Sequence, residues 1–322
     1  MSRVFAVVPA VAILAACMSS GLGPPGATVP HANEGQWSEN EAVAASGFYA
    51  STRLGSDFAI KGFNNPGRGN GPPICSISLT GSVHNVAVDG RGYLIVPLVA
   101  KRNQVIIYKG PGMCGKARSL IRDPYGSPVD AAAMDADRLT VIANLVDNNG
   151  HTGSISLCAS ARGCYSNLTN PAIGQVVGVA LARNGDCWAD GDSANSGAAL
   201  VFFKGCSGSG QQTTGFKSRT HGGLDIDSAG NLVTIESGTY SYLRVYKRCN
   251  PACTLVGGPF SLHGVVLYGH LDQKSKHFVA ANSRLEQLDF YKYSPGGLTY
   301  LYSVNHDIFN LQGAAFNPRS SE

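Results

Sequence analysis

The chain has 322 residues, of which 14% are charged, and its formal net charge is +4. Lysine and arginine are scattered singly along it, so it lacks the stripe of positive charge that binds a phosphate backbone, and we exclude nucleic acid as a partner. An apolar content of 43%, with aromatic residues throughout, excludes extended disorder beyond the N-terminal region.

The N-terminal 17 residues have the pattern of a cleaved export signal. Arg3 precedes an apolar run that ends in Leu14-Ala15-Ala16-Cys17, and this run is too short to span a bilayer. Its end resembles the bacterial lipobox, in which the cysteine is acylated and becomes the first mature residue. The resemblance implies a lipid anchor on Cys17 in the cell envelope. Because Met18 is not the aspartate that retains lipoproteins in the inner membrane, the outer membrane or periplasm is favoured. An ordinary secretory signal with an incidental Cys17 is the alternative.

Residues 18–42 are rich in Gly, Pro and Ser and show no hydrophobic period. Such a composition is typical of a spacer without a packed core. We therefore expect a flexible linker that holds a single domain, residues 43–322, away from the membrane.

A repeat of about 45 residues determines the expected fold. A short apolar strand, a polar turn closed by glycine and a second apolar strand recur, as in Val86–Leu94 and Leu224–Leu232. The equivalent turn positions are 89, 135, 182, 227, 272 and 317, with spacings of 46, 47, 45, 45 and 45 residues. Each unit continues with a third strand that ends in an aromatic residue and with a fourth strand. Four short strands per repeat are typical of a β-propeller blade.

The two ends of the repeat array predict how the ring closes. The last repeat stops after its first strand, Gly313–Phe316, and the domain begins with a second strand, Gly47–Ser51. The C-terminal strand should therefore join the N-terminal blade, which removes an exposed sheet edge. The expected fold is all-β, a closed six-bladed β-propeller of four-stranded blades.

The strand–Asp–x–x–Gly–x–Leu–strand pattern resembles the six-bladed NHL, gluconolactonase-like and strictosidine-synthase-like propellers, over about residues 47–322. It is also similar to the propeller lipoproteins of bacteria. The resemblance implies the architecture and leaves the function open, since propellers carry many unrelated sites.

Eight cysteines follow Cys17, and an even number in an exported domain predicts disulfides. Cys158–Cys164 and Cys249–Cys253 should each close a hairpin turn. Cys187 and Cys206 lie on facing second and third strands, which leaves Cys75–Cys114 in neighbouring blades. Zinc is the alternative because Cys-x3-Cys approaches ligand spacing, but no histidine pair accompanies these cysteines.

Two sets of polar residues are candidate sites. The first lies at the ends of second strands: Asn144, Asp190, Asp192, Glu236 and Asn282. These side chains could bind a metal or a polar ligand, or hydrogen-bond their own turns, and Glu236, a poor turn former, is the candidate catalytic residue. The second set lies at the starts of innermost strands, near the channel mouth: His84, Asp130, Gln175, His221 and Gln312. Two histidines and an aspartate would suit a divalent cation, whereas a single histidine at a strand start would be solvated or hydrogen-bonded.

We therefore expect a non-enzymatic, monomeric binding or scaffold module for an envelope protein, a glycan or a small polar ligand. The alternative, implied by the resemblance to gluconolactonases, is a lactone or ester hydrolase that depends on Ca, Mg or Zn. Those enzymes hold the cation with Glu, Asn and Asp, and this sequence has no complete matching motif, so no cofactor is assigned. A third possibility is an assembly factor for outer-membrane proteins.

Overall fold

The computed structural model describes residues 45–54, 57–64, 71–99, 103–108, 117–148, 150, 152–193, 197–247 and 249–318. The predicted export signal, Cys17, the linker 18–42 and Cys114 lie outside these residues. Over the described part of the chain, no helix has the length and apolar character needed to cross a membrane.

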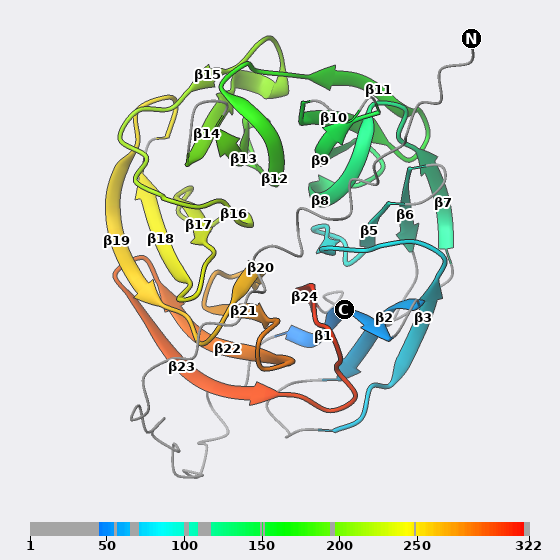
Figure 1. Ribbon diagram of the computed structural model, residues 1–322. Helices are drawn as coiled ribbons and strands as arrows, with labels where there is room; N and C mark the ends of the chain where they lie inside the picture. The colour runs from blue at the N-terminus through cyan, green and yellow to red at the C-terminus, as the bar shows by residue number, and fades with distance from the viewer. Residues whose placement is uncertain are drawn as a thin grey trace, which may run out of the picture. The chain divides into compact units, whose positions relative to one another are not determined.

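The described residues form six antiparallel sheets of four strands each, arranged in a ring (Figure 1). The innermost strands are β4 (Ala87–Val88), β8 (Gly126–Asp135), β12 (Ile173–Leu181), β16 (Leu224–Ile226), β20 (Val266–Leu271) and β24 (Gly313–Pro318). The second strands are β1 (Ala45–Leu54), β5 (Leu94–Leu98), β9 (Leu139–Asp147), β13 (Cys187–Ser193), β17 (Leu232–Glu236) and β21 (His277–Asn282). This is the predicted six-bladed propeller.

The outer half of each blade completes the sheet. The third strands are β2 (Asp57–Asn64), β6 (Gln104–Tyr108), β10 (Ser154–Ala159), β14 (Ala198–Phe203), β18 (Tyr242–Lys247) and β22 (Gln287–Ser294). The outermost strands are β3 (Cys75–Leu79), β7 (Ala117–Arg122), β11 (Gly163–Leu168), β15 (Gln211–Gln212), β19 (Thr254–Ser261) and β23 (Gly297–Val304). One short 3-10 turn, η5 (Lys204–Cys206), follows β14.

Burial along the strands explains their composition. The second strands β5 and β17 are buried at every position, because neighbouring blades cover both faces of each sheet, and their sequences are nearly continuous apolar runs. The outermost strand β19 instead alternates between exposed and half-buried residues, as a strand with one solvated face does. The hydrophobic core therefore lies between the blades.

The closing strand lies where the sequence predicts it. β24 pairs with β1, with Phe316 opposite Phe48 and Ala314 opposite Ala50, and the first and last strands of the chain lie side by side (Figure 1). Phe48 stacks on Phe63 at 4.8 Å and meets the edge of Phe290 in the preceding blade at 5.0 Å. The junction of the two chain ends is thus packed as a continuous core.

The turns between first and second strands join neighbouring blades. Asp89 accepts hydrogen bonds at Oδ1 from the N–H groups of Arg91 and Tyr93, at 2.9 and 2.8 Å. Its Oδ2 accepts a 2.9 Å bond from the N–H of Ala136 in the next blade. Gly92 has φ of 82°, which a glycine adopts without steric cost. One buried carboxylate therefore shapes its own turn and fixes the next blade.

Three disulfides have both cysteines within the described residues: Cys158–Cys164, Cys187–Cys206 and Cys249–Cys253. They are the pairs that the alignment of the blades predicts, and each lies within one blade. The fourth predicted pair, Cys75–Cys114, includes a residue outside the described part and stays a prediction.

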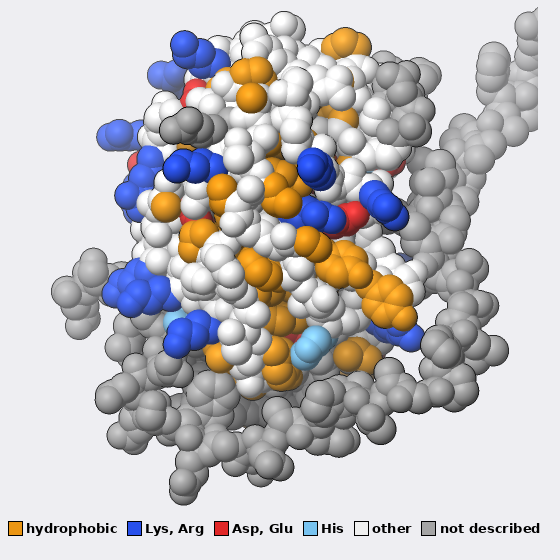
Figure 2. Space-filling model, turned by 90° about the vertical axis from the view of Figure 1, so that its left-hand side faces the viewer, with side chains coloured by type: hydrophobic (Ala, Val, Ile, Leu, Met, Phe, Trp, Pro, Cys, Tyr) orange, Lys and Arg blue, Asp and Glu red, His pale blue; other side chains and the backbone are white. Residues whose placement is uncertain are grey.

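The outer wall on the side of β19 has hydrophobic side chains interspersed with basic ones and few acidic ones (Figure 2). Among the described residues, the exposed large hydrophobic side chains come from many parts of the ring: Ile74, Leu120, Met134, Tyr165, Tyr240, Val256, Leu285 and Phe309. Their distribution does not single out one blade as an apolar docking surface.

Candidate functional site

A pocket of about 1470 Å³ opens at the end of the ring where the innermost strands run into the turns toward the second strands. We call it the turn-end pocket. All six sheets contribute to its wall, through the segments 87–91, 131–134, 180–184, 224–232 and 270–275 and through Ala315 and Phe316. Its volume is ample for a small ligand, because such sites usually enclose roughly 300–1,000 Å³.

One position in the repeat creates both the space and the polarity of this pocket. It is two residues before the turn position, and four blades carry alanine there: Ala87, Ala133, Ala180 and Ala315. The two remaining blades, which are neighbours, carry Asp225 and His270 at the same position. The alanines leave room around the axis, and the aspartate and histidine make one side of the pocket polar.

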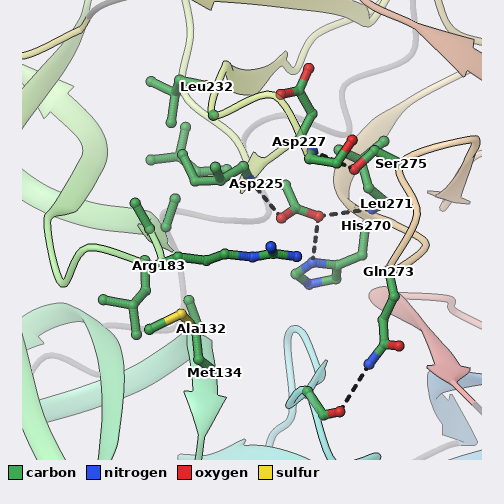
Figure 3. A pocket seen from close by; sticks show the side chains of 18 of the residues that line it. Ala132, Met134, Arg183, Asp225, Asp227, Leu232, His270, Leu271, Gln273 and Ser275 are labelled. Atoms are coloured by element: carbon green, nitrogen blue, oxygen red, sulfur yellow. Dashed lines mark hydrogen bonds and ion pairs between the residues drawn. The ribbon is translucent and has the colours of Figure 1, made fainter. Parts of the chain in front are cut away.

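Asp225 and His270 form a pair held by backbone groups (Figure 3). Asp225 Oδ2 lies 3.4 Å from His270 Nδ1 and accepts a 2.8 Å hydrogen bond from the N–H of Leu271. Its Oδ1 accepts a 2.7 Å bond from the N–H of Ile226. Burial lowers the pKa of His270, but Asp225 and the more distant Asp130 outweigh burial and raise it above its ordinary value.

Below this pair, a buried polar network crosses the axis of the ring. Asn85 Nδ2 lies 3.1 Å from His270 Nε2 and donates a 2.7 Å hydrogen bond to Asp130 Oδ1. Asp130 Oδ2 accepts a bond from Val179 N–H, and burial raises the pKa of Asp130 to about 6. Tyr268, also from β20, donates its hydroxyl to a carbonyl of β12. The contacts of Asn85 with His270 and of Tyr268 with β12 join non-adjacent blades, so the network forms a floor beneath the turn-end pocket.

The rim of the pocket carries long basic side chains. Arg183, Lys247 and Lys274 are exposed and contribute to its lining. Arg183 extends into the pocket toward Asp225 and His270 (Figure 3). Gln273 bridges the opening by donating a 3.1 Å hydrogen bond to the carbonyl of Gly90.

The five residues predicted at the channel mouth do not line this pocket. His84, His221 and Gln312 precede their innermost strands, at the opposite end from the turns. His221 Nδ1 lies 2.6 Å from Asp192 Oδ1, and Gln312 bonds the carbonyl of Asn310. Gln175 lies in β12 opposite Asp192. Asp130 is part of the buried floor.

The predicted set at the ends of second strands lies at that same opposite end, since Gln175 pairs with Asp192 and Val266 with Asn282. Asn144 donates a 2.6 Å hydrogen bond to Ser156 Oγ, and Asn282 donates a 2.8 Å bond to Asp289. Asn144 lies inside β9, three residues before its end. Each amide is therefore bonded within its own blade.

Asp190 links two blades at this end of the ring. It is fully buried, and its Oδ2 accepts a 3.2 Å hydrogen bond from Gly222 N–H in the next blade. Burial raises its pKa well above the ordinary value.

Glu236, the candidate catalytic residue, forms a nearly buried ion pair. Arg244 donates to its Oε2 from Nε and Nη2, at 2.9 and 2.7 Å. Its Oε1 accepts a 3.1 Å bond from the N–H of Arg219. Both carboxylate oxygens have partners inside the blade. These partners are sufficient to explain why a glutamate is buried at this position.

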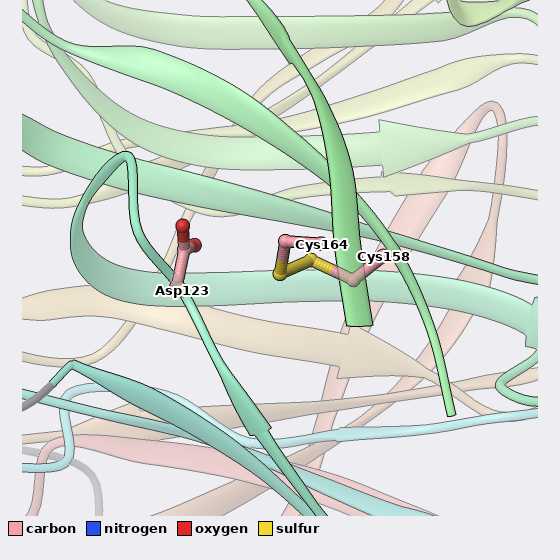
Figure 4. A group of neighbouring side chains, drawn as sticks. All are labelled: Asp123, Cys158 and Cys164. Carbon is pink, nitrogen blue, oxygen red and sulfur yellow. A yellow bond between two sulfur atoms is a disulfide. The ribbon is translucent and has the colours of Figure 1, made fainter. Parts of the chain in front are cut away.

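Within the described residues, Asp123, Cys158 and Cys164 lie close enough together to be considered as metal ligands (Figure 4). The two cysteines are joined in a disulfide, so neither sulfur is available as a thiolate. Asp123 accepts hydrogen bonds from Ser156 Oγ and Tyr125 N–H. The chemistry of this donor set does not fit a cation.

No protein-family model matches the chain, and no curated protein matches its sequence. A protein of unknown function from Bacteroides caccae superposes with a TM-score of 0.58 and 11% identity, over 84% of this chain and 98% of that one. A hypothetical selenium-binding protein from Sulfolobus tokodaii gives 0.56 and 11%, over 86% and 95%. A putative 6-phosphogluconolactonase from Bacteroides fragilis NCTC 9343 gives 0.55 and 10%, over 87% and 99%. Likeness at such identities shows the propeller fold alone.

The candidate residues predicted from the sequence do not include those that form the turn-end pocket. Asp225, His270 and Arg183 are not among them, nor is Asn85. The register of the repeat contained a signal for the first two, because four alanines against an Asp and a His is a visible break in pattern. Nothing in the register indicates the contact of Asn85 with His270, which joins residues 185 positions apart.

Proposed function

We propose that the propeller binds a small polar ligand in the turn-end pocket and does so as an exported protein anchored to the cell envelope through Cys17. The observation that carries the proposal is the layer of four alanines with Asp225 and His270. A ring built only for stability would fill these axial positions, because packed interiors leave few voids. Here the small side chains leave space, and the polar pair stands on one side of it.

The pocket has the features of a ligand site rather than of a pore. Its floor is closed by the network through Asn85 and Asp130, and its wall combines the alanines with Leu224, Leu232 and Trp188. The wall also carries polar and charged side chains, among them Asp225, His270 and Arg183, and convergent polar groups of this kind orient a ligand in a small-molecule site.

The pocket favours a small ligand over the other two candidate functions. A docked protein would be expected to cover a contiguous apolar surface, whereas the exposed hydrophobic residues described here are spread around the ring. A metal-dependent hydrolase would need several oxygen or nitrogen donors around one point, whereas Glu236 is paired with Arg244 and Cys158 with Cys164. Binding of a small ligand in the turn-end pocket requires neither a contiguous apolar surface nor a set of metal ligands.

The test is a thermal-shift screen of the purified chain against sugars, sugar acids, amino acids and nucleotides. We expect at least one compound to raise the unfolding midpoint, because a ligand at a hundred times its Kd adds about 2.7 kcal/mol to the free energy of unfolding. The variant Met134→Trp places a large ring in the pocket at a position that is 38% exposed, so we expect the fold to accept it. This variant should lose the shift.

Leu120→Trp is the matched control, because Leu120 is 63% exposed on β7 and does not line the pocket. It should respond to the compound as the unmodified chain does. The proposal is wrong if no compound shifts the midpoint, or if Met134→Trp and Leu120→Trp respond alike.

A further inference from the structure

We infer that the ligand of the turn-end pocket is a small anion bearing a carboxylate or phosphate group, with Arg183 as its principal partner. The inference rests on the proposed function and names the chemical class of the ligand. It follows from which charged groups of the pocket already have partners and which do not.

The carboxylates of the pocket are occupied by hydrogen-bond donors of the protein. Asp227 accepts bonds from Ala229 N–H, Asn231 and the Tyr293 hydroxyl, at 2.8 to 3.0 Å. Asp272 accepts from Lys276 N–H and lies 2.8 Å from His277 Nδ1. Asp89 and Asp225 each accept from backbone N–H groups on both sides of a blade boundary. Asp186 accepts from Gly205 N–H and Asn184.

These acidic side chains are committed to shaping turns. Asp89, Asp227 and Asp272 are at most 6% exposed, and their bonded donors stabilise the negative charge where it stands. A cationic ligand would have to compete with several short hydrogen bonds to reach them. The carboxylates of the pocket are therefore poor partners for a cation.

The basic side chains of the rim, unlike these carboxylates, are not bonded to other groups in the described part of the protein. Within the described residues, Arg183, Lys247 and Lys274 have no ion pair or side-chain hydrogen bond. Arg91, by contrast, is paired with Asp135 and Asp137. The charged side chains that remain free to bond a ligand directly are therefore basic, and they come from three different blades.

Arg183 is the side chain best placed to make the contact. It extends from the end of β12 into the pocket, toward the Asp225–His270 pair (Figure 3). A guanidinium presents a planar fork of N–H donors that matches a carboxylate or phosphate in two parallel bonds. Lys247 and Lys274 at the rim would supply further charge to a ligand with a second anionic group.

The experiment is isothermal titration of the full chain with three probes: inorganic phosphate, citrate and neutral glucose. We expect binding of phosphate or citrate and not of glucose, and the comparison of the two anions separates phosphate from carboxylate recognition. Arg183→Gln should weaken anion binding by about tenfold or more, since a charge-assisted hydrogen bond is worth about 1.5–3 kcal/mol.

Arg219→Gln is the control, because Arg219 is also exposed but precedes β16 at the opposite end of the ring. Its affinity for the anion should equal that of the unmodified chain. The inference is overturned if neither anion binds, or if the two arginine variants bind it equally. Binding of glucose that Met134→Trp abolishes would uphold the proposed function while overturning the choice of an anion.

Discussion

The His84 imidazole couples the stability of the propeller to pH. Burial lowers its pKa to about 4, from an ordinary value of 6.5. The side chain has the Ser82 hydroxyl at 3.4 Å from its Nε2 as a polar neighbour. A protonated His84 would therefore be poorly solvated in the folded state, whereas the unfolded chain protonates it freely.

His84→Gln should flatten the acid limb of the stability curve. Because the folded pKa lies below the unfolded one, the contribution of His84 is complete above pH 6.5 and is lost as the pH falls toward 4. Between pH 7 and 4, the free energy of unfolding of the variant should fall by about 1–3 kcal/mol less than that of the unmodified chain. Urea unfolding at several pH values measures this difference, with the exposed His306→Gln as control. Parallel curves for His84→Gln and the unmodified chain would contradict it.

Asp130 has the opposite dependence on pH. Its folded pKa of about 6 exceeds its ordinary value, because burial outweighs the donors around it. Its contribution therefore favours folding as the pH falls from 6 to 3.8 and partly offsets that of His84. The free energy of unfolding of the unmodified chain thus depends on pH through two groups whose effects are opposite. The contribution of His84 is therefore the difference between the unmodified chain and the His84→Gln variant.

At the scale of the element, the turn between first and second strands is the recurring unit of this ring. Asp89 and Asp227 bond N–H groups of their own turns in the same way. Asp89 adds a bond to Ala136 in the next blade, and Asp225 adds one to Leu271. A turn carboxylate or its neighbour therefore determines the spacing between blades as well as the path of the chain.

Asp89→Ala should destabilise the protein by about 2–4 kcal/mol, because three backbone N–H groups at a buried site lose their acceptor. Asp89→Asn keeps one carbonyl oxygen and should cost less. Chemical denaturation of the two variants compares them directly. If both variants unfold at the same denaturant concentration as the unmodified chain, the carboxylate does not join the blades as we describe.

At the scale of the whole molecule, stability depends on closing the ring. The core between the first and last blades includes Phe48, Phe63, Phe290, Leu311 and Phe316. β24 supplies Phe316 to it and covers the edge of β1. Without β24, this edge would expose unpaired backbone groups and the apolar residues behind it.

Deletion of residues 313–322 should abolish cooperative unfolding and cause aggregation, as measured by near-ultraviolet circular dichroism and gel filtration. A permuted chain, in which the closing strand precedes β1 through a short turn, should restore cooperative unfolding and remain unaggregated. Every other blade enters its second strand through such a turn. A monomeric deletion variant that unfolds at the original temperature would show that the ring does not depend on its closing strand.

The architecture of this protein can be predicted from its amino-acid sequence alone. Spacings near 45 residues set the number of blades, and the incomplete repeats at Gly47 and Gly313 specified the closure. The pairs Cys158–Cys164, Cys187–Cys206 and Cys249–Cys253 followed from the same register. These features depend on local periodicity, which a single sequence contains in full.

Where the polar residues meet, by contrast, is visible only in the folded ring. The sequence predicts His84 and His221 at a channel mouth and Glu236 as a candidate catalytic residue; the structure shows that Glu236 is paired with Arg244 and that the turn-end pocket lies at the other end of the ring from these three residues. Asn85 reaches His270, and Tyr268 reaches β12, across blades that are not neighbours. Such contacts depend on how six blades converge on one axis, and a repeat register records the equivalence of the blades but not the distances between them.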